Sequence, residues 1–327
     1  RYRDWKPSVL SAIRDVSRQN DYHPNVLTTF GTPMSDHLIG LELKKLYGVP
    51  WLAHFSDPWV ENEFKGYNSF TRGINVALER KVVEAADRLI FTSAETVALV
   101  MRKYPKNFIA KTRVLSHAFE PGLFDRTKKP AGSRIVIRYV GDLYGRRTPA
   151  PLFRALAEIL VSDPGLLDEI CFEFVGSITD FELSEVGFDQ LPRGLVEFHP
   201  TVDYLESLSL MSSAEGLLVI DAPAKTSVFL PSKLIDYIGA ARPVLGITPP
   251  GAAAKLIGEL GGWVTDPTDA AGTQAAVRSF ISYLRENRAE RFQAWGDATV
   301  RQRFDAGAVA RRFEEMVGEL VGQYGAR

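Results

Sequence analysis

The stretch VFLPSKLIDYIGAARPVLGI, residues 228–247, decides the fold of the surrounding chain. Pro231, Ser232 and Lys233 begin a short amphipathic helix, and an Arg-Pro pair then stops it directly before an apolar strand. A helix start carries free backbone N–H groups and the positive end of the helix dipole, so a hydroxyl and an ammonium placed there favour an anion. The stretch therefore predicts a helix-to-strand unit that binds phosphate.

Outside this unit, segments of strand character alternate with segments of helical periodicity over most of the chain. Strands are predicted at 25–30, 51–55, 89–93, 114–116, 134–140, 171–175, 195–198, 216–220, 244–247 and 263–264. Helices are predicted between them at 37–47, 72–86, 94–102, 149–161, 204–212 and 252–259, with further helices at 270–288 and 306–324. This alternation predicts an α/β fold with mostly parallel sheets that are covered by helices on both faces.

A segment without periodicity, HAFEPGLFDRTKKPAGS at 117–133, divides this pattern and is the expected linker. We predict a Rossmann-like domain over 1–117, a second over 118–301, and a C-terminal helix over 302–327 that returns to the first domain. Such a domain normally opens with a strand, whereas the first element predicted here is a helix. The N-terminal domain is therefore expected to lack its first strands in this sequence.

Composition narrows the class of protein. The 327 residues are 45% hydrophobic and 11% aromatic, which suffices for two cores, and the net charge of -1 argues against a nucleic-acid-binding surface. Cys171 is the single cysteine and is expected to be a buried strand residue. No apolar run approaches the roughly 20 residues that span a bilayer, and no signal peptide is visible, so a cytoplasmic location is expected.

A second basic loop follows the strand predicted at 134–140. Gly141 opens this loop, and Arg146 and Arg147 close it. Guanidinium groups at the carboxyl end of a buried strand can bind phosphate oxygens in a bidentate manner, although a solvated loop has the same composition. The Pro-Ser-Lys helix start would project from the same edge of the sheet, which favours phosphate binding.

Asp236 lies four residues after Ser232 and three after Lys233, so the three side chains share one face of the helix. A carboxylate one turn below a phosphate site can accept hydrogen bonds from ribose hydroxyls. An intrahelical ion pair between Lys233 and Asp236 has the same spacing. The sequence leaves both interpretations open.

These residues carry a resemblance to a known family. PSKLIDYIGAARPVLGI is similar to the donor-site helix PSKLxEYxAxGxPVL of GT-B glycosyltransferases of the family 4 type, in its PSK-containing bacterial subfamily. GVPWLAHFSDPW, from residue 48, resembles the first-domain motif GxPWxADFRDPW. ADRLIFTS, from residue 86, and RYVGDLYGRRTPAPLFRAL, from residue 138, are similar to the last strand of that domain and to the opening of the donor domain.

The resemblance implies two Rossmann-like domains that face each other across a cleft, with a nucleotide sugar held by the second domain and an acceptor by the first. It implies metal-independent transfer with retention of the anomeric configuration, and no cofactor besides a nucleoside diphosphate sugar as co-substrate. Separately, the spacing of the histidines predicts no metal site. The donor-binding residues that it implies are Gly141, Arg146, Arg147, Pro231, Ser232, Lys233 and Asp236.

The sequence also departs from the family pattern. Val228 stands where the family often has a Glu near the donor sugar, and His54 and Ser56 replace an Asp and an Arg of the first-domain motif. His54 and Asp57 are the expected catalytic residues on the acceptor side. Alternatively, His54 is a hydrogen-bonded residue at the end of a strand, and Asp57 caps the following turn.

The expected function is transfer of a hexosyl-like group to a glycan or lipid-linked acceptor in the synthesis of bacterial surface polysaccharide. With a lipid-linked acceptor, we expect peripheral contact with the inner face of the cytoplasmic membrane. Two alternatives stay open: a nucleotide-sugar 2-epimerase on the same fold, and a degenerate relative that binds a nucleotide sugar without turnover.

Overall fold

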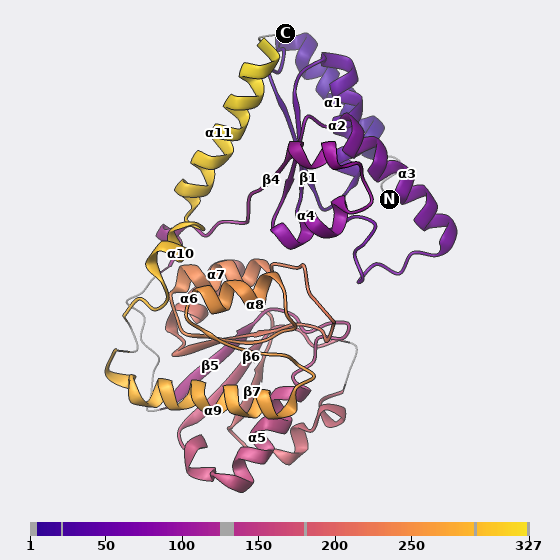
Figure 1. Ribbon diagram of the computed structural model, residues 1–327. Coiled ribbons are helices and arrows are strands. Elements are labelled where there is room, and N and C mark those ends of the chain that lie inside the picture. The colour runs from indigo at the N-terminus through magenta and orange to yellow at the C-terminus, as the bar shows by residue number, and fades with distance from the viewer. Residues whose placement is uncertain (1–4, 21, 125–133, 180–181, 291–292, 326–327) are drawn as a thin grey trace. The chain divides into compact units, whose positions relative to one another are not determined.

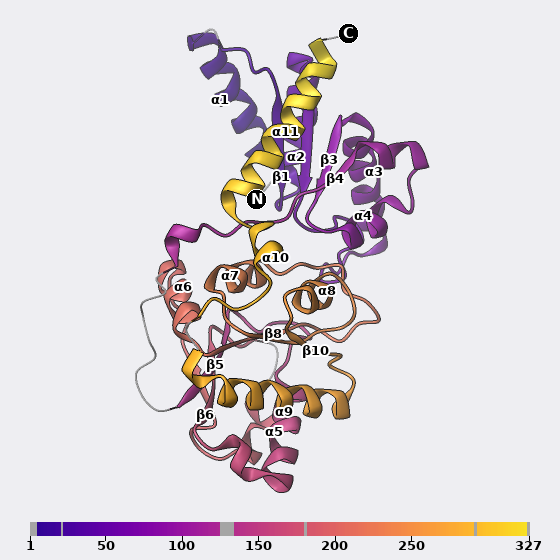
Figure 2. The same ribbon diagram turned by 60° about the vertical axis from the view of Figure 1, so that its left-hand side comes forward.

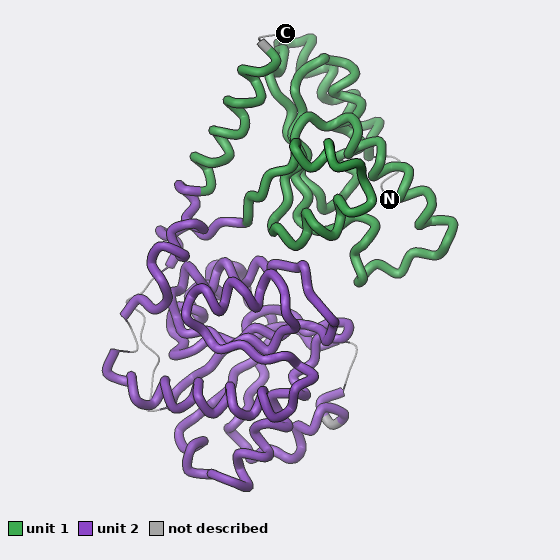
Figure 3. The backbone as a smooth tube through the Cα atoms, viewed as in Figure 1, with its two compact units in different colours: residues 1–116, 309–327 green, residues 117–308 purple. Residues whose placement is uncertain are grey.

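A computed structural model describes residues 5–20, 22–124, 134–179, 182–290 and 293–325. The chain folds into two compact units, shown in Figure 3. Unit 1 comprises Arg1–Ser116 and Val309–Arg327, and unit 2 comprises His117–Ala308. Residues 125–133, the second half of the expected linker, lie outside the described residues.

Unit 1 is built on a sheet of parallel strands in the order β1-β2-β3-β4 (Figure 1). The strands are β1 (Leu27–Gly31), β2 (Trp51–Phe55), β3 (Arg88–Phe91) and β4 (Thr112–Val114). The helices are α1 (Trp5–Asn20), α2 (Ser35–Tyr47), α3 (Ser69–Ala85) and α4 (Ala94–Met101), and the C-terminal helix α11 (Ala306–Gly325) enters this unit at Val309.

Strand β2 is buried along its whole length, and its side chains alternate between two cores. Trp51 packs into one core together with residues of α2, α3 and α4. Leu52 faces the other, where it meets Ile90 and Leu320 of α11. A hydrogen bond of 2.9 Å from the Tyr324 hydroxyl to Asp87 Oδ1 holds the end of α11 beside β3. Residues far apart in the sequence thus complete one core.

Unit 2 contains a sheet of parallel strands in the order β10-β9-β8-β5-β6-β7. The strands are β5 (Ile135–Val140), β6 (Ile170–Val175), β7 (Val196–His199), β8 (Gly216–Ile220), β9 (Val244–Ile247) and β10 (Trp263–Thr265). Figures 1 and 2 show α5 (Ala150–Ser162) and α9 (Ala270–Glu286) on one face, with α6 (Tyr204–Ser213), α7 (Ser232–Ala240) and α8 (Ala252–Glu259) on the other. The α/β class expected from the alternation is confirmed.

Short helical turns connect these elements. They are the 3-10 turns Lys106–Lys111, Pro121–Leu123, Pro164–Leu167, Leu183–Val186, Phe188–Gln190 and Arg288–Glu290, and the helix α10 (Ala298–Gln302).

The first half of the expected linker is part of the core of unit 2. Phe119 and Phe124 are buried in the same cluster as α7, and a Cβ on Gly239 would lie 2.4 Å from the Phe124 ring. The Phe119 N–H donates to the carbonyl of Phe304 at 2.9 Å. A linker over the whole of 117–133 was therefore wrong for its first residues, because two phenylalanines bury themselves against α7.

Candidate functional site

The order of strands in unit 2 creates a topological switch point. The chain proceeds from β5 to β6 on one side of the sheet and later reaches β8 on the other side of β5. In open parallel sheets, the loops that leave the carboxyl ends of such a strand pair diverge and form the ligand site. Here these are the loop that begins at Gly141, after β5, and the loop that begins at Asp221, after β8 and before α7.

Lys233, on the first turn of α7, reaches the end of β5. Its ammonium donates to the Tyr139 hydroxyl at 2.6 Å and lies 3.8 Å from the centroid of that ring. Burial lowers the pKa of Lys233 to about 7, and the charge of Arg147 lowers it as well, against the opposite effect of Asp142 and Asp221. The charge of Lys233 therefore changes close to neutral pH.

Gly141 makes this placement of the ammonium possible. Its φ of 125° lies in the region that favours glycine, and a Cβ built on it would lie 2.7 Å from Lys233 Nζ. Gly176, at the end of β6, has a φ of 144°, and its Cβ would lie 2.4 Å from the Gly141 carbonyl oxygen. The two glycines thus allow the ends of β5 and β6 to lie close together. Sequence reasoning missed Gly176, although it directly follows an apolar strand as Gly141 does.

The structure separates the two candidate arginines. Arg147 has a side chain only 12% exposed, its Nε donates to Asp221 Oδ1 at 3.0 Å, and its guanidinium carbon lies 4.8 Å from the Tyr144 ring centroid. Its charge also acts on the pKa of Lys233. Arg146 is exposed. Of the two, Arg147 is the cation that is built into the site with Lys233.

Asp221 is a site residue that sequence reasoning missed. It is 2% exposed and directly follows the apolar strand β8. Besides Arg147, its carboxylate accepts the Ala222 N–H and the Ser227 hydroxyl, both at 2.8 Å. The sequence signal that could have identified Asp221 is a single acidic residue directly after an apolar strand. The partner that explains it lies on the loop after β5, which no local pattern indicates.

The start of α7 is open to an anion. Pro231 precedes the helix with φ -60° and ψ 133°, and Ser232 is exposed. Within the described residues, no side chain caps this helix. The N–H groups of the first turn therefore keep the positive end of the helix dipole available beside Lys233.

Asp236 does not pair with Lys233. It accepts a hydrogen bond of 3.2 Å from the Tyr204 hydroxyl, whereas Lys233 is held by Tyr139. Burial raises the pKa of Asp236 to about 6. The described residues thus do not contain the intrahelical ion pair, and the carboxylate has capacity for further donors such as ribose hydroxyls.

The expected catalytic residues of unit 1 lie at the carboxyl end of β2. His54 is 6% exposed, pairs in register with Phe30, and has its ring centroid 5.3 Å from that of Phe30. Asp57 follows the strand and is half-buried. His37 is fully buried and its Nδ1 lies 2.8 Å from Thr29 Oγ1. Burial and the charge of His54 lower the pKa of His37 to about 3, so His37 is neutral.

Glu79 holds the loop that follows β2, and sequence reasoning missed it too. The side chain is fully buried on α3, where its carboxylate accepts the Val60 N–H at 3.1 Å and the Tyr104 hydroxyl at 2.7 Å. Lys103 Nζ lies 2.7 Å from the same carboxylate. The sequence signal that could have identified Glu79 is an acidic residue at an apolar position of the α3 pattern.

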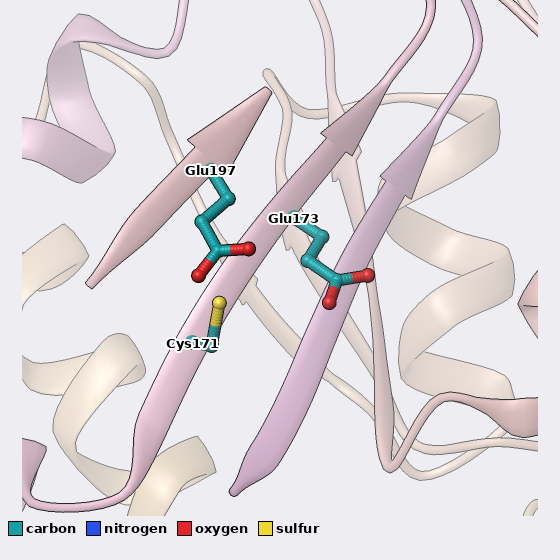
Figure 4. A group of neighbouring side chains, drawn as sticks. All are labelled: Cys171, Glu173 and Glu197. Atoms are coloured by element: carbon teal, nitrogen blue, oxygen red, sulfur yellow. The ribbon is translucent and has the colours of Figure 1, made fainter. Parts of the chain in front are cut away.

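Cys171, Glu173 and Glu197 form a cluster whose ligand atoms lie within 4.8 Å of one another (Figure 4). Arg138 Nε donates to Glu173 at 2.6 Å, and Arg134 donates to Glu197 at 2.6 Å. Burial raises the pKa of the Cys171 thiol to about 12, so the thiol keeps its proton. Each carboxylate is thus already paired with an arginine, and the cluster is charge-balanced by these two ion pairs. Cys171 is buried, as the sequence predicted.

Comparison with known proteins shows the fold. No protein-family model and no curated protein matches the sequence. Sucrose-phosphate synthase of Thermosynechococcus elongatus is similar in structure with a TM-score of 0.67 at 19% identity, over 97% of this chain and 78% of that one. The Anabaena protein HepE, solved with UDP and glucose, gives 0.63 at 16% identity over 94% and 81%.

A UDP-forming trehalose-phosphate synthase of Burkholderia xenovorans gives a TM-score of 0.71 at 11% identity, over 98% of this chain and 78% of that one. These similar structures are GT-B glycosyltransferases, and at such identities the likeness concerns the fold alone. Among the described residues, no helix combines the length and apolarity that would be needed to cross a membrane.

Proposed function

We propose that the chain is a glycosyltransferase of the family 4 type that transfers a hexosyl group from a nucleoside diphosphate sugar to a glycan or lipid-linked acceptor. One observation carries the proposal. Lys233 and Arg147 are held at the carboxyl edge of one sheet, beside the uncapped start of α7. Two cations and a helix start together suit a diphosphate better than a single phosphate.

The diphosphate is the leaving group of such a transfer. Its negative charge grows as the bond to the sugar breaks, so fixed positive groups stabilise the transition state more than the bound donor. Lys233 and Arg147 supply this charge without a divalent cation, which supports metal-independent transfer. Asp236 accepts the ribose hydroxyls, and departure of the diphosphate on the face where the acceptor enters gives retention.

His54 and Asp57 are the proposed catalytic residues on the acceptor side, where they orient the acceptor hydroxyl or the sugar. Val228 leaves the donor sugar without the carboxylate that the family pattern often has there. The proposed setting is synthesis of bacterial surface polysaccharide in the cytoplasm, with peripheral contact at the membrane when the acceptor is lipid-linked. A bound UDP and a bound UDP-glucose in HepE structures support a nucleotide sugar as donor.

Calorimetry with UDP, GDP and dTDP tests the donor site. Wild-type protein is expected to bind one of the three, and Lys233→Ala is expected to lose at least tenfold in affinity because the diphosphate loses a partly buried cation. Lys81→Ala, an exposed lysine on α3, is the control and should bind as wild type. The donor assignment fails if no nucleotide binds, or if Lys233→Ala binds all three as tightly as wild type.

Donor turnover distinguishes the remaining candidates. Slow hydrolysis of the nucleotide sugar that His54→Ala or Asp57→Ala abolishes identifies a transferase. Nucleotide binding without any hydrolysis or transfer identifies the non-catalytic relative. Formation of the epimeric nucleotide sugar in the absence of an acceptor identifies the 2-epimerase.

A further inference from the structure

The Tyr139 hydroxyl joins the two elements that hold the proposed phosphate subsite. It donates to the Asp142 carbonyl at 3.0 Å, and it accepts from Lys233 Nζ at 2.6 Å. Since Lys233 can only donate and the carbonyl can only accept, the direction of both bonds is fixed. A single oxygen atom thus links the loop after β5 to the first turn of α7.

The surroundings of Tyr139 keep this oxygen in place. The side chain is 1% exposed, and its ring centroid lies 5.7 Å from that of Phe174 on the neighbouring strand. The ammonium of Lys233 rests against the same ring, and the backbone of Gly141 lies so near it that a Cβ there would come within 2.7 Å of Nζ. The lysine is therefore confined by contacts that leave little freedom for its head group.

We propose that Tyr139 is the positioning residue of the phosphate subsite, and that its hydroxyl holds the Lys233 ammonium charged and aimed across the start of α7. The proposal rests on the proposed function, because the subsite is that of the donor diphosphate. An ammonium has three donors. One stays on Tyr139, and two remain for phosphate oxygens.

The charge balance around Lys233 explains why an acceptor is needed there. Arg147 faces it from the loop after β5, and this positive charge disfavours the ammonium, as burial does. Asp142 from the same loop and Asp221 from the end of β8 favour it. On its own helix, Asp236 is bonded to Tyr204, and the Tyr237 hydroxyl is bonded to backbone groups of β5 and β8. Within the part of the chain that the structure describes, the ammonium donates its hydrogen bond to the Tyr139 hydroxyl.

Tyr139→Phe removes this oxygen and keeps the ring. Without the acceptor, the neutral form of Lys233 is favoured, so its titration is expected to move to lower pH. A shift of one pKa unit makes the charged fraction about tenfold smaller at pH 8, and binding of inorganic pyrophosphate and of UDP should weaken by the same factor there. The loss should be smaller at pH 6, where more of the lysine stays charged.

Tyr237→Phe is the matched control. Tyr237 is also fully buried, and its hydroxyl accepts from the Val140 N–H at 2.9 Å and donates to the Leu218 carbonyl at 3.2 Å. It bonds to the same sheet but to neither Lys233 nor Asp142. This variant should lose stability while the titration of Lys233 and the pH profile of binding stay in place.

Two measurements test the role of Tyr139 separately from nucleotide binding. Competitive labelling of lysines with acetic anhydride, read by mass spectrometry over pH 5.5 to 9, gives the titration of Lys233 in the unliganded full chain. Calorimetry gives pyrophosphate and UDP affinity over the same range. The proposal is overturned if Tyr139→Phe titrates Lys233 as wild type does, or if Tyr237→Phe moves it equally. If wild type binds neither probe, the proposed function fails, and the labelling still decides whether Tyr139 holds Lys233.

Discussion

Arg147 Nε donates to Asp221 Oδ1 across 3.0 Å and so joins the loops that leave the carboxyl ends of β5 and β8. This contact spans the switch point of the sheet. Because Asp221 binds the Nε side of the guanidinium, it fixes the direction of the two terminal nitrogens, which are the groups that bind phosphate in a bidentate manner. We therefore expect Asp221 to influence phosphate binding through Arg147.

Replacing Asp221 should affect both binding and stability. Asp221→Ala removes the acceptor of Arg147, the Ala222 N–H and the Ser227 hydroxyl, so we expect about tenfold weaker nucleotide binding and a loss of about 2–4 kcal/mol in the free energy of unfolding. Calorimetry and urea denaturation measure the two effects. Asp266→Ala, whose carboxylate caps an exposed turn, is the control. Unchanged affinity in a folded Asp221→Ala protein would contradict the role.

Gly141→Ala should abolish the arrangement of Lys233. Its Cβ would lie 2.7 Å from Lys233 Nζ, on a backbone with φ 125°, so the lysine must move and nucleotide affinity should fall at least tenfold. Gly145→Ala is the matched control, since Gly145 has φ 61° but nothing within 4 Å of its Cβ. This control should cost about 1 kcal/mol of stability from backbone strain and leave binding nearly unchanged. Equal nucleotide affinities for the two variants would refute the prediction.

Nucleotide binding should pass through a maximum with pH. Burial raises the pKa of Asp236 to about 6, and only the ionised carboxylate accepts both ribose hydroxyls, so affinity should fall as the pH drops below 6. Burial lowers the pKa of Lys233 to about 7, so affinity should fall as the pH rises above 7. Calorimetry from pH 5 to 9 checks the profile.

Single substitutions assign the two limbs of this profile. Asp236→Asn should flatten the acidic limb, and Lys233→Arg should flatten the alkaline limb because a guanidinium stays charged. A profile that keeps both limbs in both variants would show that other groups titrate there.

Glu79 should matter for the stability of unit 1. Glu79→Gln keeps the size of the side chain but loses the charge beside Lys103 and one acceptor of the buried set, so we expect a loss of about 2–4 kcal/mol in the free energy of unfolding. Urea denaturation followed by tryptophan fluorescence measures it. Glu84→Gln, exposed on the same helix, should change stability by less than about 0.5 kcal/mol. A Glu79→Gln protein as stable as wild type would argue against the anchoring role.

The sequence by itself determined the fold class and indicated the edge of the sheet at which the candidate site lies. Hydrophobic periodicity and helix stop signals are local, so they predicted strands at 51–55 and 216–220 and a helix at 252–259 with the bounds that the structure has. The Pro-Ser-Lys start of α7 is equally local. Its position after β8 follows from the alternation of strands and helices.

Only the tertiary structure decided which side chains act together. Tyr139 and Lys233 lie 94 positions apart, and Arg147 and Asp221 lie 74 apart, so no spacing in the sequence indicates either pair. Pairing of β5 with β8 brings them together, and the close approach at Gly141 then sets where the ammonium lies. The sequence likewise could not show that Arg147, and not Arg146, pairs with Asp221. Residue types are encoded locally, whereas the partner that orients a buried charge depends on which strands become neighbours.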